Sequence, residues 1–130
     1  MVNMTAPQPF TYRARVDRVI DGDTLVMQID LGFHMTAKVS VRLLGVDTPE
    51  LRGGTEESKQ RARNAKAFAD VWCNEAVGLP APADEWAEWP FVVTTAKGDS
   101  FGRWLGRVYA VRTGEELSQA LLDNGHAVPL

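Results

Sequence analysis

The stretch "RVIDGDTLVMQID" (residues 18–30), followed closely by "KVSVRLLGVDTPE" (residues 38–50), decides the fold class of this chain. In both parts apolar residues occupy every second position: Leu25, Met27, Ile29, Val39, Val41 and Leu43. A period of two places those side chains on one face of an extended strand. The second strand carries Arg42 near its end and stops at a turn that contains Asp47 and Glu50.

Strands are predicted on both sides of the Asp-Gly-Asp turn in this stretch. Alternation of apolar and polar residues predicts strands over residues 10–17, 25–31 and 35–43. The pattern places Leu31 and Met35 on the same apolar face as the other alternating residues. Short connections between alternating strands indicate an antiparallel meander.

An amphipathic helix is expected after the third strand. Apolar residues there recur at gaps of three and four, the stripe of a helix: Ala62, Ala65, Ala69, Trp72 and Ala76. Thr55 can cap its first turn, and Gly78 followed by a proline ends it. The Pro-rich acidic segment at residues 79–90 is typical of a surface loop. We interpret Trp86 and Trp89 as folded back onto the protein rather than docking a partner.

The remaining elements complete a small barrel. Residues 91–96 and 104–112 alternate as two further strands, and a short helix is predicted over residues 115–124. Three strands, a helix, two strands and a short helix predict a mainly β fold with helices (α+β). This order suits a five-stranded OB-type barrel with a helix between strands 3 and 4 and a short C-terminal helix. We expect residues 1–9 to form a flexible arm and residues 10–130 a single domain.

Composition narrows the classes of function. The 14 basic residues are outnumbered by 17 acidic ones, which argues against a protein that coats nucleic acid by bulk attraction. A nucleic-acid partner therefore requires arginines that are concentrated locally. Cys73 is the only cysteine, so a disulfide framework and a cysteine metal site are excluded, and a buried inert thiol is favoured. The absence of a signal-peptide pattern predicts a cytoplasmic protein without a membrane partner, and we expect a monomer.

Acidic residues gather at the ends of two strands. Asp21 and Asp23 lie in the turn that leaves the first strand, and Asp47 and Glu50 in the turn that leaves the third. In a meander these two strands run the same way on either side of the second, so both turns share one rim of the barrel. Ca²⁺ prefers several carboxylate and carbonyl oxygens, and Asp23 and Asp47 can supply two of them. The proline after Thr48 favours an extended backbone that would fix the direction of the Thr48 carbonyl.

Two arginines distinguish this arrangement from ordinary turns. Asp-Gly-Asp and Asp-Thr-Pro are common turn sequences, and each acidic residue taken singly fits a turn-forming role better than a ligand role. Arg42 lies on the polar face of the third strand, and Arg103 follows another turn. A guanidinium offers a planar charged fork for phosphate oxygens, and Lys38 could add to the same basic surface. Carboxylates for a cation together with two arginines are the groups that phosphodiester cleavage needs.

Three segments together resemble a known family. "VIDGDTLVM", "VRLLGVDTPE" and "GDSFGRWLGRVY" are similar, in order and spacing, to the signature blocks of the thermonuclease family, also called staphylococcal-nuclease-like domains. The resemblance extends over about residues 16–128, nearly the whole chain. It implies an OB-type barrel and a calcium-dependent nuclease that hydrolyses phosphodiester bonds of DNA and/or RNA.

The resemblance also implies a metal site. Asp23 and Asp47 match the carboxylates that bind Ca²⁺, and the backbone carbonyl of Thr48 matches a further ligand. Asp21 matches a nearby acidic position that supports the site without binding the ion directly.

The same resemblance assigns the groups that act on the phosphate. Glu50 matches the residue that activates the attacking water, and Arg42 and Arg103 match the pair that grips the scissile phosphate. Ser100 and Phe101 depart from the family, which often carries a lysine and a tyrosine there.

Alternatives remain for the function and for other polar residues. OB-type barrels also serve as non-catalytic modules that bind nucleic acid or protein, and an inhibitor domain on the same barrel is a further alternative. The basic residues of the predicted helix fit a solvated face better than a phosphate-binding patch: Lys59, Arg61, Arg63 and Lys66. His34 and His126 are interpreted as ordinary surface residues.

Overall fold

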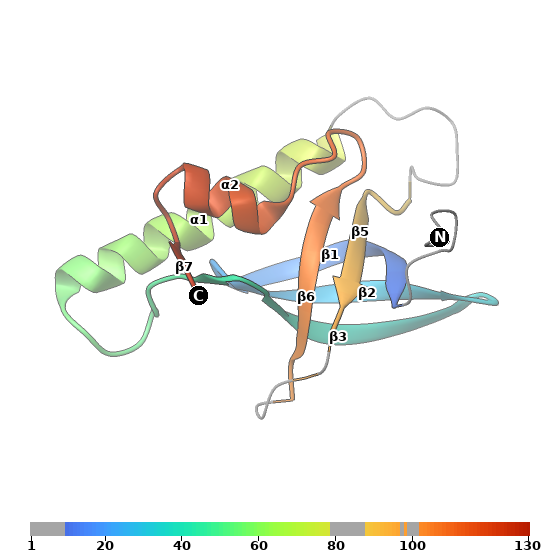
Figure 1. Cartoon of the computed structure of the whole chain (residues 1–130), viewed down its shortest axis with the longest axis horizontal. Helices are drawn as coiled ribbons and strands as arrows, with labels where there is room; N and C mark the ends of the chain where they lie inside the picture. The colour runs from blue at the N-terminus through green and yellow to red at the C-terminus, as the bar shows by residue number, and fades with distance from the viewer. Residues whose placement is uncertain (1–9, 79–87, 97, 99–101) are drawn as a thin grey trace, which may run out of the picture.

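The computed structural model describes residues 10–78, 88–96, 98 and 102–130 (Figure 1). Its elements in chain order are β1 (Thr11–Asp21), β2 (Thr24–Gly32), β3 (Met35–Leu43), β4 (Val46–Asp47), α1 (Glu56–Gly78), β5 (Phe91–Thr95), β6 (Trp104–Ala110), α2 (Leu117–Asp123) and β7 (Val128–Pro129). The predicted N-terminal arm and most of the predicted acidic loop, including Trp86, lie outside the described residues. Ser100 and Phe101 lie outside them as well.

Five strands close into a barrel in the order β1-β2-β3-β6-β5. β1, β2 and β3 pair antiparallel as a meander, and β5 pairs antiparallel with both β1 and β6. β3 and β6 run parallel, which joins the two halves. The predicted OB-type α+β fold is confirmed, and both helices lie above the barrel in the view of Figure 1.

β1 is longer than its alternation predicts. Its register against β2 shifts between Val16 and Arg18 and again between Val19 and Asp21. Such bulges insert an extra residue and break the period of two, so the pattern ceases to predict a strand although the strand continues. The extension turns Val19 into the core and carries Asp21 to the end of the barrel.

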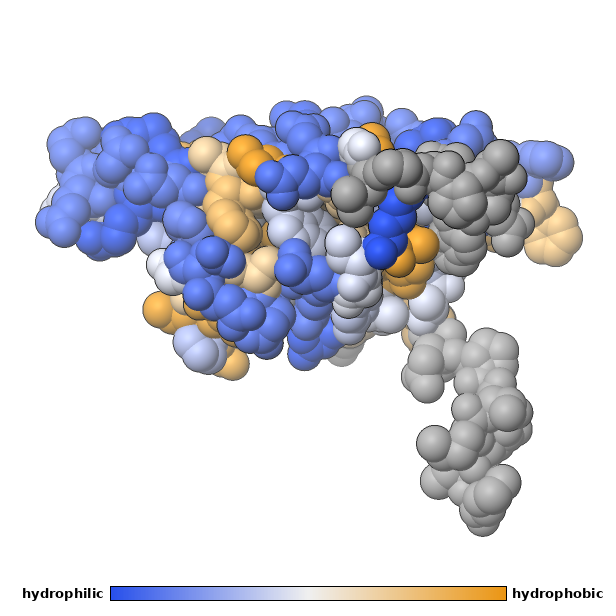
Figure 2. Space-filling view, turned by 90° about the horizontal axis from the view of Figure 1, so that it is seen from above, coloured by the Kyte–Doolittle hydropathy of each residue, from blue (hydrophilic) through white to orange (hydrophobic). Residues whose placement is uncertain are grey.

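The core fills the barrel and the space below α1, but the β2–β3 hairpin extends beyond it. Leu31 and Met35, predicted on the apolar face of their strands, are 43% and 59% exposed. They are exposed because they flank the hairpin tip, which projects past the closed barrel at the right of Figure 1. Figure 2 shows apolar atoms exposed at that projecting end of the molecule.

α1 begins and ends where its sequence predicts. The Thr55 hydroxyl accepts a hydrogen bond from the backbone N–H of Ser58, an N-cap contact, and the helix ends at Gly78. The predicted alanine-rich stripe is buried, and so is Cys73, whose thiol pKa is raised to about 12 chiefly by burial. Trp89, as predicted, folds back onto the barrel, where the Arg15 guanidinium lies 4.3 Å from its ring centroid. None of the helices in the described part of the chain is long and apolar enough to cross a membrane.

α2 is shorter than predicted, and a second small sheet follows it. Glu115 and Glu116 pair with the end of β6, and Glu116 is the N-cap residue, so α2 itself begins at Leu117. Gly125, with φ of 75°, ends α2 in the left-handed conformation that glycine favours. The chain then forms β7, which pairs antiparallel with β4. Sequence patterning did not predict this sheet, because strands of two residues carry no period.

The turn at Gly22 packs tightly against α1. A methyl group at Gly22 would lie 2.8 Å from Cβ of Ala65 and 3.2 Å from its carbonyl carbon, so the turn approaches the helix backbone only because both residues are small. We expect Gly22→Ala to lower the free energy of unfolding by about 1–3 kcal/mol, the usual range for overpacking. Urea unfolding measures this.

The control for this substitution is Gly78→Ala at the end of α1. A methyl group at Gly78 meets nothing within 4 Å, so Gly78→Ala should leave stability unchanged or slightly raised. Equal stability of the Gly22→Ala and wild-type proteins would contradict the close contact with α1.

Candidate active site

The ends of β1 and β3 meet at one rim of the barrel. The backbone N–H of Leu43 donates to the carbonyl of Asp23 at 2.8 Å, and Thr24 pairs with Arg42 across β2 and β3. The two acidic turns therefore line one cavity of about 480 Å³. Its polar lining residues are Asp21, Asp23, Arg42, Asp47, Thr48, Glu50, Arg52 and Arg103.

Asp23 holds the second turn in place. Its carboxylate is buried and accepts hydrogen bonds from the Thr24 hydroxyl and from the backbone N–H of Thr48, both at 3.1 Å. The bond to Thr48 joins residues that are 25 apart in the chain. A buried carboxylate without such donors would be costly, so the turn and the carboxylate stabilise each other.

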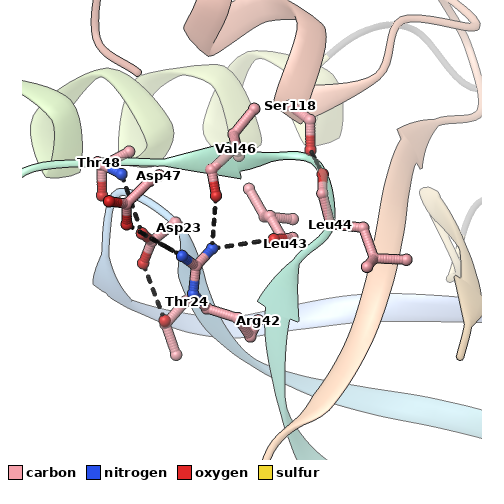
Figure 3. Close-up of polar contacts among 9 residues, drawn as sticks. All are labelled: Asp23, Thr24, Arg42, Leu43, Leu44, Val46, Asp47, Thr48 and Ser118. Atoms are coloured by element: carbon pink, nitrogen blue, oxygen red, sulfur yellow. Dashed lines mark hydrogen bonds and ion pairs between the residues drawn. The ribbon is translucent and has the colours of Figure 1, made fainter. Parts of the chain in front are cut away.

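The contacts of Arg42 explain why an arginine stands near the end of β3. It lies on the outward face of β3, and its guanidinium folds over the end of the strand (Figure 3). Nη1 donates to the carbonyls of Leu43 and Val46, both at 2.9 Å. Nη2 lies 3.1 Å from Oδ1 of Asp47 and 3.4 Å from Oδ2 of Asp23. One side chain thus fixes the turn that follows β3 and draws both carboxylates together.

The turn after β3 is also anchored by three other segments of the chain. The Ser118 hydroxyl of α2 donates to the carbonyl of Leu44 at 3.2 Å, and the N–H of Leu44 donates to Gly106 of β6. The N–H of Leu130 donates to Gly45, next to the pairing of β4 with β7. Three separate segments therefore hold the backbone that presents Asp47.

Asp21 is placed among charged groups of both signs. Burial raises the pKa of its carboxyl, and the nearby carboxylates of Asp23 and Glu50 raise it further. Arg103 and Arg52 act in the opposite direction on the same pKa. These influences show that residues from three separate turns share one electrostatic environment.

The cavity contains oxygen ligands that suit a hard cation. The carboxylates of Asp23 and Asp47 share one guanidinium nitrogen and so lie close together. The Thr48 hydroxyl oxygen is buried and has no hydrogen-bond partner among the described residues. No group of three or more acidic, histidine or cysteine side chains in the described ranges could hold a metal alone. A cation here would need two carboxylates completed by backbone oxygens and water, a set that fits Ca²⁺.

The charge balance of the cavity also favours a cation. The described residues of the lining carry four carboxylates, those of Asp21, Asp23, Asp47 and Glu50, against three guanidinium groups, those of Arg42, Arg52 and Arg103. Among these residues there is no positive excess with which to attract a phosphate. A bound divalent ion would reverse that balance.

One predicted binding residue lies elsewhere, and one lining residue was not predicted. Lys38 is absent from the cavity lining given above, and its ammonium pairs with Asp17 at 3.1 Å. Arg52 lines the cavity but was overlooked in the sequence. Its position two residues after Glu50, in a turn already rich in carboxylates, is the signal that could have identified it.

Comparison with known protein families gives a match over residues 40–129, to the staphylococcal nuclease homologue (SNase) family. This chain belongs to the SNase family. A comparison with curated proteins finds no match. The SNase match confirms the predicted resemblance and places the chain in a nuclease-like family that acts on nucleic acids.

The SNase match begins within β3, so it includes the turn with Asp47 but not the turn with Asp23. The structure connects the two parts, because Asp23 binds the backbone of Thr48 and of Leu43 inside the matched region. Both acidic turns of this SNase homologue therefore belong to one cavity.

Proposed function

We propose that the protein is a calcium-dependent nuclease that hydrolyses phosphodiester bonds of DNA and/or RNA. One observation carries the proposal: a single cavity gathers two adjacent carboxylates, an accessible third carboxylate and three guanidinium groups. Membership of the SNase family supports the same reaction.

The carboxylates of Asp23 and Asp47 and the carbonyl of Thr48 are the proposed ligands of Ca²⁺. When bound, the ion would supply neutralisation of phosphate charge and orientation of the nucleophile. Asp21 lines the same cavity, and its pKa is raised chiefly by burial and also by the carboxylates of Asp23 and Glu50. Its proposed role is to support the site from beside the ion.

Glu50 is the proposed general base. It is exposed on the cavity wall, in the segment between β4 and α1, so a water molecule can reach its carboxylate. Its carboxylate would take the proton from the attacking water, a contribution that typically amounts to about 10²–10⁴-fold in rate.

Arg42 and Arg103 are the proposed phosphate-binding groups, and they are not equivalent. Nη1 of Arg42 is held by two backbone carbonyls, so Nη2, which pairs with the two carboxylates, is the nitrogen available to donate to a phosphate oxygen. Arg103 precedes β6 and approaches the cavity from another turn. Donors placed on charge that develops in the transition state are worth about 10²–10³-fold each.

A plasmid-nicking assay tests the proposal. We expect the purified protein to convert supercoiled DNA to nicked and linear forms in calcium, and to stop in excess chelator. A labelled RNA in parallel would show which nucleic acid is preferred. Undiminished cleavage in chelator would exclude the metal assignment. Binding of the labelled nucleic acid without any cleavage would instead favour a non-catalytic OB module.

A further inference from the structure

A second cavity of about 310 Å³ adjoins the proposed active site. Asp47, Thr48 and Pro49 line both cavities, so only this short segment separates them. The other walls come from Arg61 on α1 and from residues 125–128 between α2 and β7.

Among the described residues, the second cavity combines one permanently charged cation, Arg61, and one carboxylate, that of Asp47, with mainly apolar walls. Arg61 provides a guanidinium, while Pro49, Ala127 and Val128 provide apolar surface. The volume is close to the lower end of ligand sites, about 300–1,000 Å³, which suits a ligand the size of one nucleotide. A guanidinium beside an apolar wall suits a nucleotide, because the phosphate can pair with the guanidinium while the sugar and base pack against the wall.

His126 adds an aromatic face with a defined position. Its ring centroid lies 4.8 Å from that of Phe68 on α1. Its backbone N–H donates to the carbonyl of Leu121 at 2.9 Å as α2 ends. The ring contact with Phe68 and the backbone bond at the end of α2 hold His126 in the wall of the cavity, and an aromatic ring offers a surface on which a base can stack.

Arg61 differs from the neighbouring basic residues of α1. Arg61 lines the cavity. Its ion pair with Glu57 joins two well-exposed side chains. Such a pair contributes little to stability, so it should compete only weakly with a phosphate for Arg61. Arg63, two residues later, is exposed and donates to Gln60 on the same helix. Arg63 therefore provides a matched control of equal charge.

We propose that this second cavity is a subsite for the nucleotide next to the scissile phosphodiester, with Arg61 on its phosphate and His126 against its base. The inference rests on the proposed nuclease function. It assigns the helix arginine and the histidine to substrate binding, roles that sequence patterning had not favoured for either residue.

The test compares a single-stranded oligonucleotide with bis(p-nitrophenyl) phosphate, a diester that lacks a flanking nucleotide. Arg61→Ala and His126→Ala should each raise KM for the oligonucleotide by about tenfold or more, the size of a lost charged or stacking contact. The kcat should stay unchanged, and cleavage of the small diester should not respond. Arg63→Ala should behave as wild type on both substrates.

Fluorescence anisotropy of the labelled oligonucleotide in calcium, with each substitution made in the Glu50→Gln protein, gives a readout that needs no turnover. There, Arg61→Ala and His126→Ala should weaken binding, whereas Arg63→Ala should not. An equal loss on both substrates, an equal loss in Arg63→Ala, or unchanged oligonucleotide binding would overturn the subsite. Failure of the wild type to cleave either substrate would instead remove the nuclease function, while the anisotropy comparison would still decide whether the cavity binds a nucleotide.

Discussion

Glu50→Gln is expected to lower kcat by about 10²–10⁴-fold while the fold and most of the substrate affinity remain. Glutamine keeps the size of the side chain and one carbonyl oxygen but cannot take a proton from water. Glu50 is exposed and makes no hydrogen bond or ion pair with the described residues, so its loss should not destabilise the protein. Removing its charge should also relieve part of the repulsion that raises the pKa of Asp21.

Single-turnover cleavage at saturating calcium measures the effect of Glu50→Gln on the chemical step. Glu56→Gln serves as the control, because Glu56 is an exposed glutamate at the start of α1 that pairs only with Lys59 among the described residues. Normal turnover by the Glu50→Gln protein would remove Glu50 as the base. A slow Glu56→Gln protein would show that general loss of negative charge, rather than a base, sets the rate.

Asp23→Ala and Asp47→Ala should both reduce cleavage to background, since each removes a proposed charged ligand of Ca²⁺. Their effects on stability should differ. Asp23 is buried and accepts a hydrogen bond from the N–H of Thr48, so Asp23→Ala leaves a buried donor unpaired and should cost about 1–3 kcal/mol. The side chain of Asp47 is 57% exposed, and its pair with Arg42 should contribute about 0–1 kcal/mol.

Urea unfolding in chelator separates stability from metal binding, and isothermal titration with calcium measures the binding itself. The Asp47→Ala protein is the informative one, because it should be folded and yet inactive. Activity in a folded Asp47→Ala protein would contradict the proposed ligand set. Equal stability of Asp23→Ala and wild type would contradict the role of Asp23 in holding the second turn.

The barrel could be predicted because its strands carry a simple pattern. Leu25, Met27, Val41 and Leu43 alternate with polar residues, and the structure buries all four. The pattern failed where the backbone departs from a regular strand. The bulges of β1 shift its register, and the β2–β3 hairpin projects beyond the core, so Leu31 is exposed despite its place in the alternation.

The candidate site could be predicted only in part. Chain direction in a meander was sufficient to place Asp23 and Asp47 at the same rim. It could not show that Nη1 of Arg42 binds two backbone carbonyls, because those contacts depend on the conformation of the turn at Gly45. Nor could it reveal the pairing of β4 with β7, whose strands are too short to carry a pattern. The assigned chemical roles stay predictions until they are measured.

The pairing of β7 with β4 has a consequence for how the protein is made. The ribosome synthesises the chain from the N-terminus, so both acidic turns are made well before residues 128–130. Until those residues appear, the turn that presents Asp47 lacks the partner strand and the hydrogen bond from Leu130 to Gly45. The wall of the second cavity at Val128 is missing as well. A nascent chain would therefore contain both proposed metal-binding turns before the strand that completes the second of them had been made.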